Sequence, residues 1–154
     1  MAVSPHIASL RARVGHDLLL LPAVAVLPVD DAGRILLVRQ ADTMAWSTIG
    51  GAIEPDESPE DAAVREALEE AGVEVRLTGV RAVLGGPEFR VRYPNGDTTS
   101  YVTIVFDAVI VSGKPQPDGD ETVAASWYSP AALPTTEMTD FTRALLRGVG
   151  VLGG

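Results

Sequence analysis

The chain contains no cysteine. This absence excludes disulfide bonds and any mechanism with a cysteine thiolate as the nucleophile. Positive charge is also scarce, because 12 lysines and arginines stand against 21 aspartates and glutamates, and the formal net charge at pH 7 is −9. Such a balance argues against binding of a nucleic-acid polymer through its phosphate backbone. It does not exclude a single nucleotide, whose phosphates local arginines and metal ions can hold.

Long hydrophobic runs are absent as well. The most apolar stretch, residues 18–27, is roughly 10 residues long, which is too short to span a bilayer and is typical of a buried strand. The N-terminus lacks the basic-then-apolar order of a secretion signal, so we expect a cytoplasmic protein without a membrane partner. With 154 residues and no repeat or linker, the chain is expected to form one domain, 1–154. Residues 1–16 and the glycine-rich tail, 148–154, are expected at its periphery, and the tail is expected to fray.

The remaining pattern is that of an α/β protein. Asn95-Gly96, between two alternating segments, is a favoured two-residue hairpin turn. In the first of these segments, apolar residues alternate with Arg90 and Arg92, which predicts one basic face. Hydrophobic periodicity and turn residues predict helices at 6–14, 59–71 and 136–147, and strands at 18–29, 34–39, 46–49, 74–84, 88–93, 98–111 and 122–128.

Residues 51–73 are the most informative segment. A glycine turn leads to Ser58, a good N-cap, and to Pro59, which suits the first position of a helix. Gly72 is a natural helix stop. These signals predict a helix over residues 59–71.

At 3.6 residues per turn, this helix has an acidic face and an apolar face. Like charges one turn apart disfavour a helix by a few tenths of a kcal/mol per pair, and a bound cation would remove that penalty. Magnesium favours oxygen ligands of this kind. The alternative is an ordinary solvated acidic surface, the usual role of such a face. The acidic face comprises Arg65, Glu66, Glu69 and Glu70, and the apolar face Ala63, Val64, Ala67, Leu68 and Ala71.

The segment resembles the Nudix box, Gly-x5-Glu-x7-Arg-Glu-U-x-Glu-Glu-x-Gly-U, in which U is a bulky aliphatic residue. Two departures are mild: Ala67 occupies the first U position, and Ile49 precedes the glycines where many relatives have proline. Neither departure removes a ligand. The matching residues are Gly51, Glu57, Arg65, Glu66, Glu69, Glu70, Gly72 and Val73.

The resemblance implies a role for each matched position. Glu69 and Glu70 would be the principal ligands of Mg²⁺ or Mn²⁺, together with the backbone carbonyl of Gly50 or Gly51. Glu66 would bind metal or act as the general base. Arg65 would pair with Glu57 and hold the carboxylates in place. The ordinary alternatives are a helical salt bridge for Arg65 and a loop carboxylate for Glu57.

The resemblance also implies a fold and a reaction. The fold is an α/β/α sandwich, with a mixed central sheet between the box helix and a C-terminal helix, and the strands at 18–29 and 34–39 form a hairpin before the box. The reaction is hydrolysis of a diphosphate linkage in a nucleoside diphosphate joined to a group X. The missing cysteine weighs against isopentenyl diphosphate isomerases, relatives whose mechanism uses one. Many relatives are homodimers, so a dimer is possible.

The nature of X is left open by the sequence. Pro87, about fifteen residues beyond the box, slightly favours ADP-ribose or another nucleotide sugar, although a plain turn explains it equally well. The alternatives are a nucleoside triphosphate pyrophosphohydrolase that sanitises the nucleotide pool and a non-catalytic nucleotide sensor.

Residues outside the box complete the candidate site. Glu121, just before the last predicted strand, resembles a glutamate that reaches the metal or acts as base in many Nudix enzymes, with Asp118 and Asp120 as alternatives. His6 and His16 are expected to be structural or exposed. The candidates for substrate binding are Arg34, Arg39, Arg90 and Trp46, with Arg92 and Tyr93 as further possibilities; surface or packing roles are the alternative for each.

Overall fold

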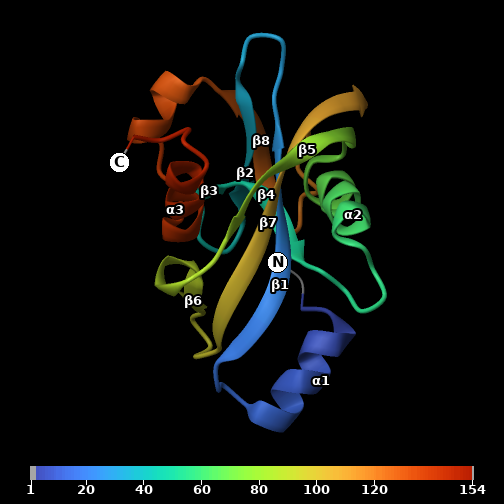
Figure 1. Ribbon diagram of the computed structural model, residues 1–154, viewed down its shortest axis with the longest axis vertical. Helices are drawn as coiled ribbons and strands as arrows, with labels where there is room; N and C mark the ends of the chain where they lie inside the picture. The colour runs from blue at the N-terminus through green and yellow to red at the C-terminus, as the bar shows by residue number, and fades with distance from the viewer. Residues whose placement is uncertain (1–2, 154) are drawn as a thin grey trace.

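The computed structural model describes residues 3–153, and Figure 1 shows its helices and strands in chain order. Residues 1–2 and 154, which belong to the predicted peripheral segments, lie outside the described residues. The elements are α1 (Pro5–Val14), β1 (Leu19–Pro28), β2 (Ile35–Gln40), β3 (Trp46–Ser47), β4 (Ile49–Ala52), α2 (Pro59–Ala71), β5 (Glu74–Leu84), the 3₁₀ turn η1 (Pro87–Phe89), β6 (Arg90–Arg92), β7 (Thr98–Ser112), β8 (Thr122–Tyr128), the 3₁₀ segment η2 (Pro130–Thr135) and α3 (Asp140–Gly148).

The strands form two sheets. The larger sheet has the order β4-β1-β7-β5, with β6 added to β7, and the smaller sheet has the order β3-β2-β8. β1 and β7 are parallel, whereas the other paired strands are antiparallel. The predicted α/β class and mixed sheet are therefore confirmed, but the strands are divided between two hydrogen-bonded sheets instead of one.

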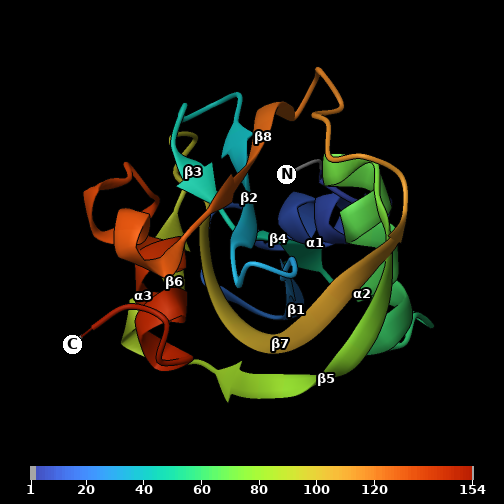
Figure 2. The same ribbon diagram turned by 90° about the horizontal axis from the view of Figure 1, so that it is seen from above.

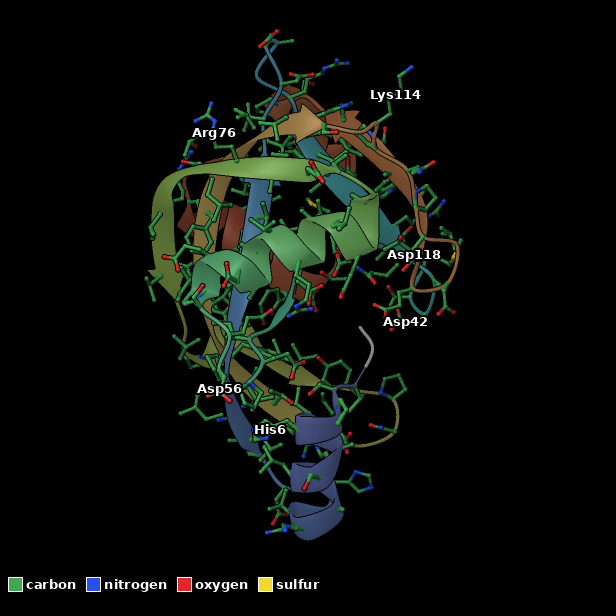
Figure 3. All side chains as sticks on the ribbon, turned by 90° about the vertical axis from the view of Figure 1, so that its right-hand side faces the viewer. His6, Asp42, Asp56, Arg76, Lys114 and Asp118 are labelled. Atoms are coloured by element: carbon green, nitrogen blue, oxygen red, sulfur yellow. The ribbon has the colours of Figure 1, made fainter. Side chains whose placement is uncertain are left out.

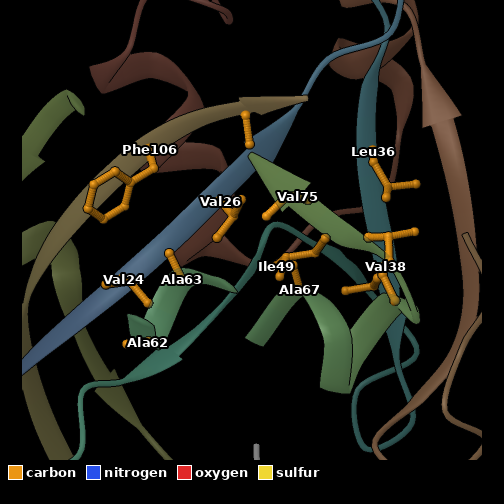
Figure 4. Close-up of a cluster of buried hydrophobic side chains, with 13 residues drawn as sticks. Val24, Val26, Leu36, Val38, Ile49, Ala62, Ala63, Ala67, Val75 and Phe106 are labelled. Atoms are coloured by element: carbon orange, nitrogen blue, oxygen red, sulfur yellow. The ribbon is translucent and has the colours of Figure 1, made fainter. Parts of the chain in front are cut away.

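β1 and β2 contribute to two cores because successive side chains of a strand point to opposite faces. Val24 and Val26 of β1, with Val38 of β2, pack against α2, and Figure 4 shows this cluster. Ala25 and Leu27 point the other way, into a cluster that includes α3. Figure 2 shows α2 and α3 on opposite sides of the strands, which confirms the predicted layers.

α2 has the predicted boundaries. The Ser58 side chain accepts a hydrogen bond from the Asp61 N–H, and Gly72 ends the helix in the left-handed conformation, with φ of 67°. The predicted apolar face is wrong at two positions, because Val64 and Leu68 are 39% and 54% exposed.

Alanines let the α2 backbone approach the strands closely. Ala62, Ala63, Ala67 and Ala71 are completely buried. Glu66 and Glu70 share this inner face and are therefore buried with the alanines, instead of lying on a separate acidic face. The orientation of α2 thus places two carboxyl groups at the edge of the core.

Several further expectations need correction. β1 and β2 do not form an extended hairpin, since their contact is an isolated bridge between Val29 and Ile35 and each strand belongs to a different sheet. The predicted strand at 88–93 is shortened to β6, because Pro87–Phe89 form a 3₁₀ turn with Phe89 buried. The predicted hairpin is confirmed, with Arg92 paired to Thr98, but its turn is not the predicted two-residue one. The Gly96 N–H donates to the Tyr93 carbonyl, so Pro94 and Asn95 occupy the centre of the turn and Gly96 follows with φ of 94°.

The C-terminal region also differs from expectation. α3 begins at Asp140 because Thr139 is the N-cap and its side chain accepts from the Thr142 N–H. The tail does not fray at Val149 and Leu152, which are 9% and 7% exposed and pack into the α3 cluster.

α1 lies beside the end of the larger sheet and has no buried residue of its own. Ile7 and Leu10 pack against the small cluster of Leu21, Ala23 and Tyr101. None of the helices formed by residues 3–153 is long and apolar enough to cross a membrane.

We expect Gly50→Ala to destabilise the protein by about 1–3 kcal/mol, the usual range for overpacking. Gly50 lies opposite Ala25 where β4 meets β1, and a methyl group there would overlap the Val24 carbonyl oxygen. The matched control is Gly79→Ala, where no atom lies within 4 Å of the new methyl group. Urea unfolding of both variants measures the difference; equal free energies of unfolding would show that β4 can move away from β1.

Candidate active site

Arg65 connects the loop before α2 to the carboxylates on the helix. Its Nε and Nη2 donate to the two oxygens of Glu57 at 2.7 and 2.9 Å. Its Nη1 donates to Glu66 Oε1 at 2.9 Å and to Glu69 Oε2 at 3.2 Å. Nη2 also donates to the Ala52 carbonyl of β4 at 3.2 Å. One guanidinium therefore positions three carboxylates relative to β4, and its hydrogen bonds lower the pKa of Glu57.

Glu66 and Glu70 lie side by side on the buried face of α2, 6% and 4% exposed. Burial raises the pKa of both carboxyl groups; the Arg65 charge partly offsets this for Glu66, whereas the Glu66 charge raises the pKa of Glu70 further. The two carboxyl groups are adjacent and out of water, so their charges repel each other, and the raised pKa values favour a proton on the pair as long as no cation neutralises it.

Two backbone contacts hold Glu70 against its neighbours. Its Oε2 lies 3.4 Å from the Gly50 N–H, at the turn that enters the box. Its carbonyl oxygen accepts a hydrogen bond of 2.9 Å from the Thr122 hydroxyl. The second contact brings the start of β8, and with it Glu121, to the C-terminal half of α2.

An acidic pocket of about 330 Å³ lies between α2 and the N-terminus of α1. It brings Glu121, from the loop before β8, together with three residues of the box helix. The loop before β8 therefore contributes a carboxylate to this pocket. The charged residues lining it are Glu54, Arg65, Glu66, Glu69 and Glu121, and α1 contributes Ser4, Pro5 and Ile7.

A second pocket, of about 250 Å³, lies on the other side of the box turn. Gly50, Gly51 and Glu70 line one end of it, so it adjoins the carboxylate pair. Its walls are mostly apolar and aromatic, from Val91, Tyr93, Tyr101 and Phe141, with neutral polar groups from Gln40, Ser47, Thr48, Thr139 and Thr142 and one charge of each sign from Asp42 and Arg92. This pocket suits a flat, uncharged group, whereas the acidic pocket suits cations and the phosphates that they bind.

Four of the predicted substrate-binding residues line neither pocket. Arg34 forms an ion pair with Asp30 at 2.7 Å, in the turn between β1 and β2. Arg39 donates to the Met44 carbonyl at 2.7 Å. Trp46 stacks edge-on against Tyr128 with ring centroids 5.1 Å apart, and Arg90 is exposed. The further candidates Arg92 and Tyr93, by contrast, do line the apolar pocket.

The remaining candidates have structural positions. Asp118 accepts hydrogen bonds from the N–H groups of Asp120 and Thr122, so it stabilises the loop before β8. Figure 3 shows Asp118 and Asp42 in loops beyond the C-terminal end of α2, and His6 on α1. His6 is exposed, and the His16 Nδ1 lies 2.7 Å from Asp97 Oδ1 at the surface, as expected for residues outside the site.

Sequence reasoning did not identify the polar residues of the apolar pocket. Gln40 donates to the Ser47 hydroxyl at 2.7 Å, which fixes its side chain at the end of β2. Thr142 accepts from the Thr48 N–H at 3.3 Å, across more than ninety residues of sequence. The sequence does show that buried strands end in polar residues. This change from apolar to polar residues identifies a pocket only once the strands are placed in space.

The donor atoms present suit a hard divalent cation. Glu66, Glu69 and Glu70 provide only oxygen ligands, and the carboxyl groups of Glu66 and Glu70 are buried and have raised pKa values. Within residues 3–153, no three acidic or histidine side chains are already gathered in metal-ligand geometry. Arg65 accounts for part of this, because its Nη1 already binds Glu66 and Glu69. A cation would therefore have to draw the carboxylates together.

Comparisons with known proteins agree with this arrangement. The NUDIX domain model matches residues 19–148. A Bacillus subtilis protein named "Putative 8-oxo-dGTP diphosphatase" is 35% identical over 109 residues, which cover 71% of this chain and 66% of that protein. The chain thus spans just under two thirds of this relative's length.

Solved structures show the same similarity. A MutT NUDIX hydrolase from Burkholderia pseudomallei has a TM-score of 0.68 and 28% identity, over 84% of this chain and 97% of that one. An ADP-ribose pyrophosphatase from Streptococcus suis has a TM-score of 0.63 and 26% identity, over 85% and 89% of the two chains. The NUDIX domain model matches well over half of the residues of this chain, and the box lies in register on α2. The chain therefore belongs to the Nudix family.

Proposed function

We propose that the protein hydrolyses a diphosphate linkage in a nucleoside diphosphate joined to a group X, with the help of Mg²⁺ or Mn²⁺. The observation that carries this proposal is the buried, adjacent pair of Glu66 and Glu70, beside Glu69 and Arg65. Burial of two adjacent carboxyl groups costs stability and is retained most often where the charges have a function. A pure nucleotide sensor needs no such pair, so the enzyme is favoured over the sensor.

Each residue of the box has a proposed role in this reaction. Glu69 and Glu70 hold the cation together with a carbonyl of Gly50 or Gly51, and Arg65, held by Glu57, keeps Glu66 in position. Glu66 or Glu121, both of which line the acidic pocket, accepts the proton of the attacking water. A bound divalent cation offsets the negative charge of the diphosphate and acidifies the attacking water. The products are a nucleoside monophosphate and phosphoryl-X, without a covalent enzyme intermediate.

The two pockets suggest how the substrate lies. The diphosphate belongs at the box turn, between the acidic pocket and Glu70, and the base extends into the apolar pocket. Arg92 lies at this second pocket and is the arginine best placed to contact a phosphate or ribose.

The position of Pro87 bears on whether X is a sugar or a phosphate. Pro87 begins η1 and lines neither pocket, so it offers no support for a nucleotide sugar. The more similar relative is named as acting on 8-oxo-dGTP. We therefore favour a nucleoside triphosphate, in which X is a phosphate, and keep ADP-ribose, named for the Streptococcus suis structure, as the second candidate.

A substrate panel tests the proposal. Purified protein is incubated with dGTP, 8-oxo-dGTP, ADP-ribose and a dinucleoside polyphosphate, each with Mg²⁺, with Mn²⁺ and with chelator. We expect cation-dependent release of a nucleoside monophosphate, with diphosphate as the second product from a triphosphate. Glu70→Gln should lower kcat by at least about 100-fold, whereas the matched change Glu60→Gln, in the exposed first turn of α2, should leave it unchanged. Turnover that persists in chelator, or in Glu70→Gln, would contradict the proposed roles.

The carboxyl pair also predicts a pH-dependent stability in cation-free protein. Because the folded pKa of Glu70 is raised, the folded state holds a proton that the unfolded chain releases, and the unfolding free energy falls as pH rises above the ordinary glutamate pKa of about 4.5. In Glu70→Gln, an amide N–H replaces that proton in the contact with Glu66. With chelator present, we therefore expect this variant to melt several degrees above the wild type at pH 8. For a chain of this length, each kcal/mol of stabilisation raises the melting temperature by about 2–4 °C.

Two comparisons make this stability prediction specific. At pH 4.5 the difference in melting temperature should shrink, because the wild-type pair is then protonated as well. Glu69→Gln is the control, since the Glu69 side chain is 57% exposed and should not show the same stabilisation. If Glu70→Gln melts below the wild type at pH 8, the pair does not carry the electrostatic penalty described here.

A further inference from the structure

The apolar pocket contains two tyrosines whose hydroxyl groups touch. Tyr93, after β6, and Tyr101, on β7, both line the pocket, and their Oη atoms are 2.6 Å apart. The Tyr101 ring is held in place by Phe141, which stacks edge-on against it with centroids 5.8 Å apart. Burial raises the pKa of both tyrosines, so both hydroxyl groups keep their protons at physiological pH.

Arg11 of α1 is hydrogen-bonded to the strand that carries Tyr101. Its Nη2 donates to the Thr99 hydroxyl at 3.0 Å and to the Thr98 carbonyl at 2.8 Å. Arg11 is fixed further by the Asp17 carbonyl, at 2.6 Å from its Nη1. A helix outside the main layers is thereby connected to the wall of the pocket.

Burial gives the tyrosine pair a direction. Tyr101 is only 5% exposed, and a buried hydroxyl proton needs an acceptor, which the Tyr93 oxygen provides at 2.6 Å. Tyr93 is less buried and lines the pocket, so its own proton is left to turn toward the pocket.

We propose that Tyr93 is a specificity-determining residue, whose hydroxyl proton is presented to the base in the apolar pocket, and that Tyr101, whose hydroxyl is hydrogen-bonded to it, is a positioning residue that fixes its direction. The ligand group that it selects is a hydrogen-bond acceptor, such as a carbonyl oxygen or a ring nitrogen of a nucleobase. This inference rests on the proposed function for the placement of the base, but the binding experiment that tests it needs no turnover.

Calorimetric titration with reaction products tests the inference. Wild type and variants are titrated in Mg²⁺ with GMP, AMP, UMP and ribose 5-phosphate, which lacks a base. We expect Tyr93→Phe to weaken binding of the preferred nucleoside monophosphate about 3- to 10-fold, the effect of one net hydrogen bond. Tyr101→Phe, which removes the hydroxyl group that orients Tyr93, should weaken it in the same nucleotide-selective way. Neither change should affect ribose 5-phosphate.

The third tyrosine supplies a matched control. Tyr128 stacks on Trp46 and does not line the pocket, so Tyr128→Phe should leave all four dissociation constants unchanged. The inference is overturned if Tyr93→Phe leaves nucleotide binding unchanged, if it weakens ribose 5-phosphate equally, or if wild type binds no monophosphate more tightly than ribose 5-phosphate. It is also overturned if Tyr101→Phe has no effect while Tyr93→Phe does, because Tyr93 would then act without its hydrogen-bonded partner.

The failure of this inference can be distinguished from failure of the proposed function. Cation-dependent hydrolysis by the wild type, together with unchanged binding by Tyr93→Phe, would leave the function standing and remove the role of Tyr93. Absence of hydrolysis with every substrate would instead contradict the function, whatever the tyrosine variants do. Melting temperatures of the variants separate a local loss of binding from a loss of folding.

Discussion

Glu66 and Glu70 lie next to each other on the buried face of α2, and the rest of the site depends on how their charge is managed. Two carboxylates in contact and out of water repel each other, and one of them takes up a proton when no cation is present. The same feature that makes the cation-free state unfavourable creates affinity for a divalent cation. Burial of the pair therefore lowers the stability of the cation-free fold and raises the affinity for a cation. α2 is stable in this position because its alanines pack closely against the strands.

The surrounding structure holds this pair in a fixed place. Gly50 lets β4 approach β1 and directs its N–H to Glu70, and Arg65 ties the loop before the helix to Glu66 and Glu69. The two pockets then meet at Glu70, one lined by carboxylates and the other by aromatic rings. This division matches a substrate with a charged diphosphate and an uncharged base. α1 takes part on both sides, since its N-terminus lines the acidic pocket and its Arg11 reaches Thr99 behind the aromatic one.

Local signals predicted what is encoded locally. Ser58 and Gly72 set both ends of α2, and Asn95-Gly96 set a hairpin, because caps and tight turns depend on a few adjacent residues. Helix periodicity alone could not show that Glu66 and Glu70 face the core, since that depends on the rotation of α2 against the strands. Likewise, Arg34 and Arg39 have the charge of phosphate ligands but are used by nearby partners, and Tyr93 and Thr142 join one pocket only through tertiary contacts.

The most direct test of the central claim is the number of protons released when the protein binds a divalent cation. Calorimetric titration of Mn²⁺ or Mg²⁺ at one pH, in buffers with different ionisation enthalpies, gives this number. We predict clear proton release near pH 6 from the wild type, because the cation displaces the proton shared by Glu66 and Glu70, and little release from Glu70→Gln. Cation binding by the wild type without proton release, or with the same release from the variant, would contradict the account.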